Sequence, residues 1–147
     1  MKIVARNKKA WHLYAILDKY EAGVALKGTE VKSLRAGKVN FSDSFARLQD
    51  DELWLDNLDI SPYAQGNINN HEPRRQRKLL LHRREIRKIR TLMSEKGLTL
   101  MPLAIYFNER GKVKIELGVC RGKKLYDKRE DIAGKEAGRL IKRIMKS

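Results

Sequence analysis

The sequence predicts a mainly β fold with short helices, in which about six antiparallel strands form a small barrel followed by a flexible basic tail. The clearest strand begins at Lys112 and has an apolar residue at every second position up to Val119. Such alternation places one face of a strand on a core. A hairpin is expected over residues 41–60, with its turn at Asp50–Asp51. The chain of 147 residues fits one domain, which should bury roughly two-thirds of the surface that the unfolded chain exposes.

The N-terminal part is predicted to contain two strands and one short helix. Residues 12–18 and 20–27 are apolar runs typical of strands. Gly23, inside the second run, indicates a bulge or the close approach of another backbone. The helix is expected between Thr29, as its N-cap, and Gly37, as its C′ residue.

The second half adds a helix and a hairpin. From Ile86 to Met93 the apolar residues recur at helical spacing, and Gly97 follows as a stop. Residues 98–107 and the strand after Lys112 would pair as a hairpin, with Pro102 at an edge or a bulge. About six antiparallel strands with short helices indicate a small barrel, with the oligonucleotide-binding type as one candidate.

The charge of the chain indicates a polyanionic partner. Lys and Arg number 33 against 18 Asp and Glu, a net charge of +15, with a sequence pI of about 10.1. This charge favours nucleic acid over a membrane as the partner. The densest run, residues 74–90, has nine cations and one acid. Five acids over residues 50–59 predict a negative patch, and therefore a molecule with two differently charged faces.

A second basic cluster follows the strand after Lys112. In the sequence Arg-Gly-Lys-Lys at 121–124, a glycine between cations would let the backbone approach a phosphate while the charged groups point out of the fold. The candidate phosphate contacts predicted from charge are Lys9, Arg74, Arg77, Lys78, Arg121, Lys123 and Lys124.

The residue types needed for catalysis are poorly represented. The three histidines, at 12, 71 and 82, lack the spacing of zinc ligands, and no nucleotide-binding or metalloprotease motif occurs. The one cysteine, Cys120, lies in a strand pattern and is expected to be inert packing. We therefore expect no enzyme activity, no cofactor and no metal site. The sequence contains neither a secretory leader pattern nor an apolar run long enough for a membrane span, so a cytoplasmic location is expected.

The C-terminal segment is predicted to be a separate part, with a barrel over residues 1–126 and a tail over 127–147. The tail opens with five consecutive charged residues and later carries apolar residues at helical spacing. Glycines at 134 and 138 weaken this helix, each by about 1 kcal/mol. It would either dock on the barrel or become ordered against a partner, and the charged linker favours the second. The apolar stripe consists of Ala137, Leu140, Ile141, Ile144 and Met145.

Five stretches of the sequence together resemble the SmpB family, the SsrA-binding proteins that partner transfer-messenger RNA in bacterial ribosome rescue. The stretches are NKKAWHLY at 7–14, YEAG at 20–23, GTEVKSLRAGK at 28–38, HEPRRQRKLLLH at 71–82 and GVCRGKKLYDKREDI at 118–132. The resemblance covers nearly the whole chain. It implies an oligonucleotide-binding-like barrel with flanking helices that binds the tRNA-like domain of the RNA.

The resemblance also implies roles for individual residues. The positions that it implies as RNA contacts are Asn7, Lys8, His12, Glu21, Leu80 and Lys114. The tail residues expected to act on the ribosome are Tyr126, Asp127, Lys128, Arg129, Ile144 and Met145. The sequence departs from the family pattern at Trp11, where an arginine is usual, at Leu13, where an acid is usual, and over 133–138, which lacks the usual charged run.

The function implied by the resemblance is tRNA mimicry without a chemical reaction on the protein. Protein and RNA together would imitate a tRNA and be delivered by elongation factor Tu with GTP. The tail would then enter the empty messenger channel of the small ribosomal subunit and form a helix there. From charge and fold alone, a ribosomal or general RNA-binding protein is an equal alternative. A membrane-surface protein is disfavoured, because the apolar stripe is narrow.

Overall fold

The computed structural model describes residues 1–64 and 70–123. The predicted tail, and most of its boundary with the barrel, lie outside these ranges. Within the two described ranges, no helix combines the length and the apolar character needed to cross a membrane. The predicted contact residues that lie outside the described residues are Lys124, Tyr126, Asp127, Lys128, Arg129, Ile144 and Met145.

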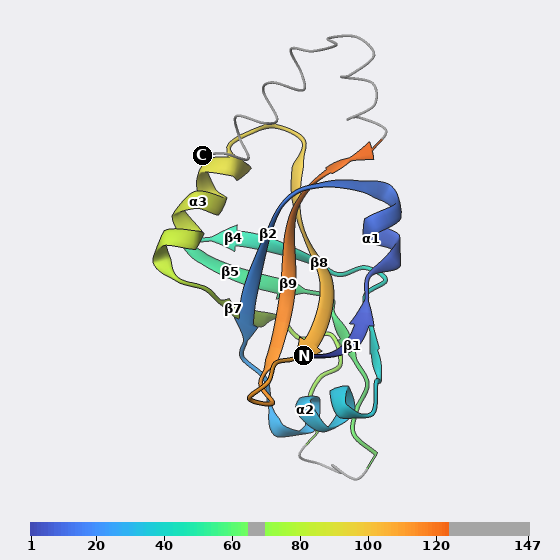
Figure 1. The fold of residues 1–147 in the computed structure, drawn as a ribbon. Coiled ribbons are helices and arrows are strands. Elements are labelled where there is room, and N and C mark those ends of the chain that lie inside the picture. Colours follow the sequence, from blue (N-terminus) through green and yellow to red (C-terminus); the bar gives the residue numbers. More distant parts are fainter. Residues whose placement is uncertain (65–69, 124–147) are drawn as a thin grey trace.

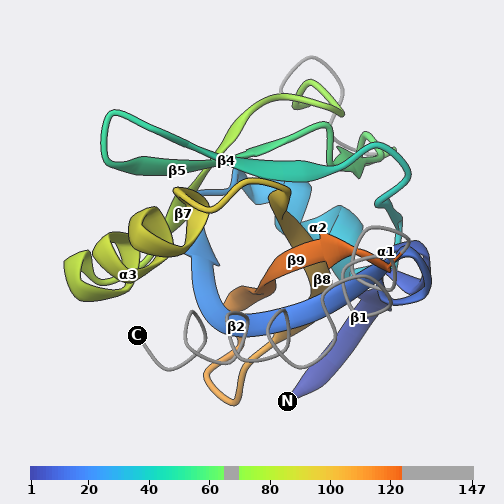
Figure 2. The ribbon, with the colours of Figure 1, turned by 90° about the horizontal axis from the view of Figure 1, so that it is seen from above.

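Six antiparallel strands close into a ring around an apolar core (Figures 1 and 2). The order around the ring is β8, β4, β5, β7, β2 and β9, and β9 pairs again with β8. The predicted mainly β fold, with six antiparallel strands and short helices, is confirmed. The strands are β1 Lys2–Arg6, β2 Tyr14–Val24, β3 Val39–Asn40, β4 Phe45–Gln49, β5 Glu52–Asp56, β6 Asp59–Ile60, β7 Arg77–Leu80, β8 Leu98–Phe107 and β9 Val113–Gly122, and the helices are α1 Lys8–Leu13, α2 Gly28–Arg35 and α3 Arg83–Met93.

The expectation of two strands over residues 12–18 and 20–27 is wrong. Helix α1 ends at Leu13, and β2 then runs without a break from Tyr14 to Val24. Asn7 begins the helix, because its side-chain oxygen accepts a hydrogen bond from the Ala10 amide at 3.2 Å. Its side-chain nitrogen donates to the carbonyl oxygen of Pro102 on β8 at 2.8 Å. This contact spans most of the chain, so a local pattern could not show it.

The long strands β2 and β8 each pair irregularly with β9 at one place. The β2–β9 register shifts between Ile16 and Asp18, and the β8–β9 register shifts after Pro102, which confirms the bulge expected there. Gly23 lies in regular pairing, but a Cβ atom on it would be 3.3 Å from the Cβ atom of Leu80 on β7. Of the two explanations for Gly23, the close approach is therefore correct.

The N-cap of helix α2 lies two residues before the predicted one. Its N-cap is Lys27, whose backbone N–H donates to the Glu30 carboxylate at 2.7 Å. The Thr29 hydroxyl is instead bonded to His71 at 2.8 Å, which explains why it does not cap the helix. Gly37 adopts φ = +72°, the left-handed conformation expected of a C′ residue.

The β4–β5 hairpin turns at Asp50–Asp51 as predicted. Both residues have positive φ, 51° and 62°, and Gln49 pairs with Glu52 on either side of them. Two central residues with positive φ are the conformation of a type I′ turn, which matches the twist of a two-stranded ribbon.

The acids near this hairpin do not form the negative patch that was expected. Four of the five are close to cations, which come from β4, from α3, from β7 and from the segment entering β7. The molecule therefore lacks the predicted negative face at this place. The pairs are Asp51 with Arg90, Glu52 with Lys78 at 3.3 Å, Asp56 with Arg47 at 2.6 Å and Asp59 with Arg74 at 3.7 Å.

Helix α3 agrees with its prediction. Ile89 and Leu92 are buried against the ring, and Gly97 follows the helix with φ = +85°. Arg84 and Arg87 are exposed to solvent. The helix thus presents a basic face outward, as its spacing predicted.

Candidate nucleic-acid interface

A groove of about 690 Å³ lies where the end of β2 meets β7 and the turn that joins β8 to β9. In Figure 1 this is the end of the ring near α2. Three predicted contact residues, Glu21, Leu80 and Lys114, line it together. Gly23 pairs with Leu80 on one side and with Lys114 on the other. The absence of a side chain at Gly23 therefore leaves room between an apolar and a cationic group.

Leu80 is the apolar element of this groove. Its neighbour Leu79 is buried, whereas Leu80 is 51% exposed, because successive residues of a strand point to opposite faces. A single exposed leucine is common on protein surfaces. Here it lies beside Gly23 and between charged residues, where it can make van der Waals contact with a base or a ribose.

Glu21 supplies a hydrogen-bond acceptor at the same groove. The Tyr106 hydroxyl donates to its Oε2 atom. Burial of Tyr106, together with its bond to Glu21 and the nearby charge, raises the pKa of Tyr106 above its ordinary value. The hydroxyl is thus always a donor at physiological pH, and it fixes one carboxylate oxygen of Glu21. The other oxygen has no hydrogen bond within residues 1–64 and 70–123, so it can accept one from a base or a ribose.

The cations of the groove lie on the β8–β9 turn and on β9. Lys112 is exposed and Lys114 is half-buried, and both line the groove. Neither makes an ion pair among the described residues, so both ammonium groups are available to phosphate oxygens. The groove thus combines an acceptor, an apolar contact and two cations, a set of groups suited to the base, sugar and phosphate of an RNA strand.

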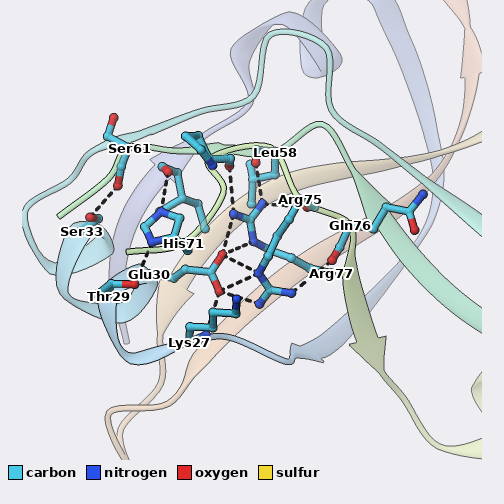
Figure 3. Close-up of polar contacts among 12 residues, drawn as sticks. Lys27, Thr29, Glu30, Ser33, Leu58, Ser61, His71, Arg75, Gln76 and Arg77 are labelled. Atoms are coloured by element: carbon cyan, nitrogen blue, oxygen red, sulfur yellow. Dashed lines mark hydrogen bonds and ion pairs between the residues drawn. The ribbon is translucent and has the colours of Figure 1, made fainter. Parts of the chain in front are cut away.

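A buried ionic cluster lies behind the groove and joins α2 to β7 (Figure 3). Glu30 of α2 accepts from Arg77 Nε at 2.6 Å and from Arg75 at 2.6 Å. Arg77 also donates to the carbonyl oxygens of Leu58 at 2.6 Å and Pro73 at 2.9 Å. These bonds fix the segment that leads into β7, and therefore the place of Leu80.

The pKa values of the two central residues follow from this arrangement. Burial opposes ionisation of Glu30, but hydrogen bonds from Arg75 and from the Lys27 amide, with the charge of Arg77, outweigh it and lower the pKa of the carboxyl group. Burial lowers the pKa of Arg77, although Glu30 acts in the opposite direction. The negative charge of Glu30 and the positive charges of Arg75 and Arg77 thus compensate each other within one hydrogen-bonded cluster.

His71 extends this cluster to the strand β6. It is buried, its Nε2 atom lies 2.7 Å from the Ile60 carbonyl oxygen, and its Nδ1 atom lies 2.8 Å from the Thr29 hydroxyl. A carbonyl oxygen only accepts, so Nε2 carries a proton and donates. His71 is thus a structural residue, and none of its polar atoms is free to bind a metal.

Two residues that were predicted to contact phosphates are not exposed to solvent in the structure. The side chains of Arg77 and Arg121 are wholly buried, Arg77 in the cluster just described and Arg121 at 3.8 Å from Glu95. This corrects the expectation that Arg121 points out of the fold. Cys120 beside it is also buried, which raises the pKa of its thiol to about 12.

The other predicted residues lie apart from the groove. Asn7, Lys8, Lys9 and His12 belong to α1 or cap it, and α1 precedes the start of β2, whereas the groove lies at the end of β2. Lys78 is close to Glu52, and Arg74 to Asp43 and Asp59. Lys123 is exposed after β9. For each of these residues, direct contact with RNA stays a prediction.

Two residues at the groove were not predicted as RNA contacts from the sequence. His82, before α3, lines the groove, and Tyr106, on β8, donates to Glu21; no local pattern marked either of them. Their place depends on the pairing of strands that are far apart in the chain, which only the fold shows. Among the described residues, no three His, Cys, Asp or Glu side chains are grouped so that they could hold a metal ion.

Comparisons with known proteins agree with one another. The family model described as "SmpB protein" matches residues 4–147. The SsrA-binding protein of Carboxydothermus hydrogenoformans is 58% identical over 146 residues, which cover 99% of this chain and 97% of that protein. The SsrA-binding protein of Desulforudis audaxviator is 60% identical over 142 residues, with 97% and 92% of the two chains covered.

A solved structure gives the same result in three dimensions. It is described as "tmRNA-SmpB: a journey to the center of the bacterial ribosome", and its chain superposes with a TM-score of 0.71 at 59% sequence identity, covering 92% of this chain and 94% of that one. Because the family match spans almost every residue and the relatives are this similar over nearly their full lengths, the chain belongs to the SmpB family.

Proposed function

We propose that this protein binds the tRNA-like domain of transfer-messenger RNA and, with it, mimics a tRNA that rescues stalled ribosomes by trans-translation. Membership of the SmpB family carries this conclusion, since the relatives are named SsrA-binding proteins and the related structure concerns tmRNA and SmpB on the ribosome. The groove supports it, because Glu21, Leu80 and Lys114 lie together there.

The tail has the second role in this proposal. Residues from Tyr126 onward engage the empty messenger channel of the small ribosomal subunit, and elongation factor Tu with GTP acts on the complex through the RNA. The charged run at 127–131 and the apolar stripe after it support this role. The protein acts in the cytoplasm by binding, and no chemical step is assigned to it.

Identifying the RNA that co-purifies with the protein from a bacterial lysate tests the proposal. A single band of transfer-messenger RNA is expected. A mixture of ribosomal RNAs and tRNAs without enrichment of that band would instead favour a general RNA-binding protein.

We expect strongly salt-dependent RNA binding. Within residues 74–90 and 112–123, six exposed or half-buried cations make no ion pair with the described residues, and each contact with a phosphate releases counterions. Six such contacts should lower the affinity on the order of a thousandfold between about 50 and 200 mM salt. The six cations are Arg83, Arg84, Arg87, Lys112, Lys114 and Lys123.

A pair of variants makes this prediction specific. Lys112→Gln should reduce the slope of log affinity against log salt by about one, as measured by filter binding. Arg90→Gln is the matched control, because Arg90 already pairs with Asp51, and it should leave the slope nearly unchanged. Equal slopes for the wild type and Lys112→Gln would show that Lys112 does not contact a phosphate. A wild-type affinity that does not change with salt concentration would contradict the electrostatic argument.

Glu21→Gln should weaken RNA binding roughly tenfold, because a charge-assisted hydrogen bond contributes about 1.5–3 kcal/mol and glutamine keeps the shape without the charge. Glu116→Gln is the control. Glu116 pairs directly opposite Glu21 on β9, so this substitution removes one negative charge at nearly the same place and leaves the Glu21 carboxylate unchanged. Affinity and melting temperature are measured together. If both are unchanged in Glu21→Gln, neither an RNA contact nor a structural role of this carboxylate is supported.

A further inference from the structure

The sheet continues from the groove to the N-terminal strand β1. Strands β2, β9, β8 and β1 pair in this order and lie side by side in Figure 1. Gly23 pairs with Lys114, and Lys114 pairs with Tyr106. Tyr106 in turn pairs with Ile3 of β1. Residues paired directly across strands lie on the same face of a sheet, so they form one row, which begins beside Leu80 on β7. From β7 to β1 the row is about 19 Å long, at about 4.8 Å between neighbouring strands.

A second row lies beside the first one. Glu21 pairs with Glu116, and Glu116 pairs with Ala104. Ala104 in turn pairs with Arg6 of β1. Ile3 and Arg6 are three positions apart, but the register of β1 shifts after Ile3, and both side chains are exposed. Arg6 makes no ion pair among the described residues, and Glu116 lies two strands away from it, at about 10 Å. We call the two rows together the open face.

Helix α1 covers the continuation of this face and stops short of the open face. Ala10 of α1 is buried with Leu103 and Cys120 in a small cluster separate from the main core. Gly118 and Cys120 follow Glu116 on β9 at intervals of two residues and therefore point to the same side of the sheet. Gly118 and Cys120 are buried, whereas Glu116 is half-buried. The accessible part of this face thus begins at Glu116 and extends toward the groove.

A recess of about 310 Å³ joins the groove to the open face. Glu21 lines both the groove and the recess. Tyr106, which is in the same row as Ile3, also lines the recess. Arg110, in the turn between β8 and β9, lines it with an exposed side chain and makes no ion pair within residues 1–64 and 70–123. The hollowed surface therefore extends from the groove toward β1, and the guanidinium groups of Arg6 and Arg110 add positive charge to it.

We propose that the RNA strand bound in the groove continues across the open face to β1, where Arg6 contacts a phosphate and Ile3 contacts a ribose or a base. This inference rests on the proposed function, because it takes an RNA strand in the groove as its starting point. Leu80 and Ile3 supply apolar contacts at the two ends of the first row, at a separation suited to the about two or three bases that a β-sheet surface holds. In the second row, the carboxylate of Glu116 repels phosphates from the middle of the face, which leaves the β1 end for a phosphate.

Arg6 also has a structural explanation that involves no RNA. Strand β1 stands at the end of the strand order, and charged residues on an edge strand hinder its pairing with another chain. Arg6→Glu separates the two explanations, because glutamate keeps a charge on the edge strand but repels a phosphate. If Arg6 only protects the edge, Arg6→Glu should bind RNA as the wild type does, and that result would overturn the inference.

Filter binding of the tRNA-like domain of transfer-messenger RNA, over a series of salt concentrations, tests the phosphate contact. Arg6→Gln should lower the affinity roughly fivefold to tenfold at about 0.1 M salt and reduce the slope of log affinity against log salt by about one. Arg6→Glu should lower the affinity further. Lys96→Gln is the matched control, since Lys96 is also exposed but precedes β8, at the other end of that strand from the recess. It should leave the slope nearly unchanged.

The apolar contact is tested by the same measurement. Ile3→Ser should weaken binding severalfold without changing the slope, because an apolar contact releases no counterions. Ile3→Val keeps an apolar side chain and should bind nearly as the wild type does. An affinity of Ile3→Ser equal to that of the wild type would overturn the role of this residue.

Amide spectra of the wild type give a second measurement that needs no variant. Addition of the same RNA should shift the signals of residues 3–6 together with those of 21–24. Shifts at 21–24 without shifts at 3–6, or an Arg6→Gln slope equal to that of the wild type, would overturn the inference and leave the groove as the binding site. A wild type that does not bind this RNA would overturn the proposed function as well. Shifts at 3–6 that follow protein concentration without RNA would show that a second copy covers β1 instead.

Discussion

Replacing Glu30 with glutamine is expected to lower the free energy of unfolding by about 3–5 kcal/mol, because breaking a buried ion pair leaves the remaining charge without compensation. Glu30 and Arg77 are both wholly inaccessible to solvent. Glu30 accepts from Arg75, Arg77 and the Lys27 amide. Glutamine retains the shape but not the charge, so the guanidinium of Arg77 would stay buried beside a neutral amide. Chemical denaturation at pH 7 measures the difference.

The pH dependence of this effect follows from the lowered pKa of Glu30. The unfolded chain has the ordinary glutamate pKa of 4.5, and the folded pKa lies below it. The stabilisation by the carboxylate is therefore fully present above pH 4.5 and is lost as the pH falls through the folded pKa. The difference in stability between the wild type and Glu30→Gln should shrink in that acidic range.

Glu52→Gln is the matched control for this substitution. Glu52 is also within 4 Å of a cation, Lys78, but both side chains are nearly half exposed, and exposed pairs contribute roughly 0–1 kcal/mol. Glu30→Gln with Arg77→Met should recover part of the lost stability, because the buried charge is then removed as well. If Glu30→Gln costs no more than Glu52→Gln, the cluster does not hold α2 and β7 together.

Strand β9, the β4–β5 hairpin and the outer helix α3 could be predicted because their patterns are local. Alternation marked β9, two adjacent aspartates marked the β4–β5 turn, and helical spacing with Gly97 marked α3. Helix α1 was missed, because the hydrogen bond from Asn7 to Pro102 that holds its start joins residues 95 positions apart.

The charges of the chain were harder to interpret than its strands. Residues 74–90 contain nine cations, but Arg77 is buried, Arg75 is close to Glu30, and Lys88 lies 3.8 Å from Asp18. Which cations face a partner depends on which acids the fold brings near them. The groove shows the converse case: Glu21, Leu80 and Lys114 are far apart in sequence, and the pairing of β2 with β7 and β9 brings them together.

Deleting residues 132–147 should abolish most tagging of peptides on stalled ribosomes while sparing folding and most RNA affinity. The ring is complete without these residues, since its six strands pair with one another within residues 1–123. A marginal helix contributes little to the stability of the ring. The deletion removes five cations and leaves 28 of 33, so RNA affinity should fall only modestly. Melting temperature, filter binding and a tagging assay measure the three properties on one protein.

The same loss of tagging is expected when Asp127, Lys128 and Arg129 are all replaced by alanine in the full-length chain. This substitution keeps the apolar stripe and alters the net charge by only one unit, so a defect would come from the motif and not from the general charge of the tail. Lys135→Ala with Glu136→Ala is the control within the tail, because it removes one charge of each sign outside both the motif and the stripe. That control should tag normally. If the truncated protein supports full tagging, the tail is not needed on the ribosome. If the truncated protein unfolds, the ring does not fold without the tail. Either result would contradict a model in which the ring binds RNA and the tail acts only on the ribosome.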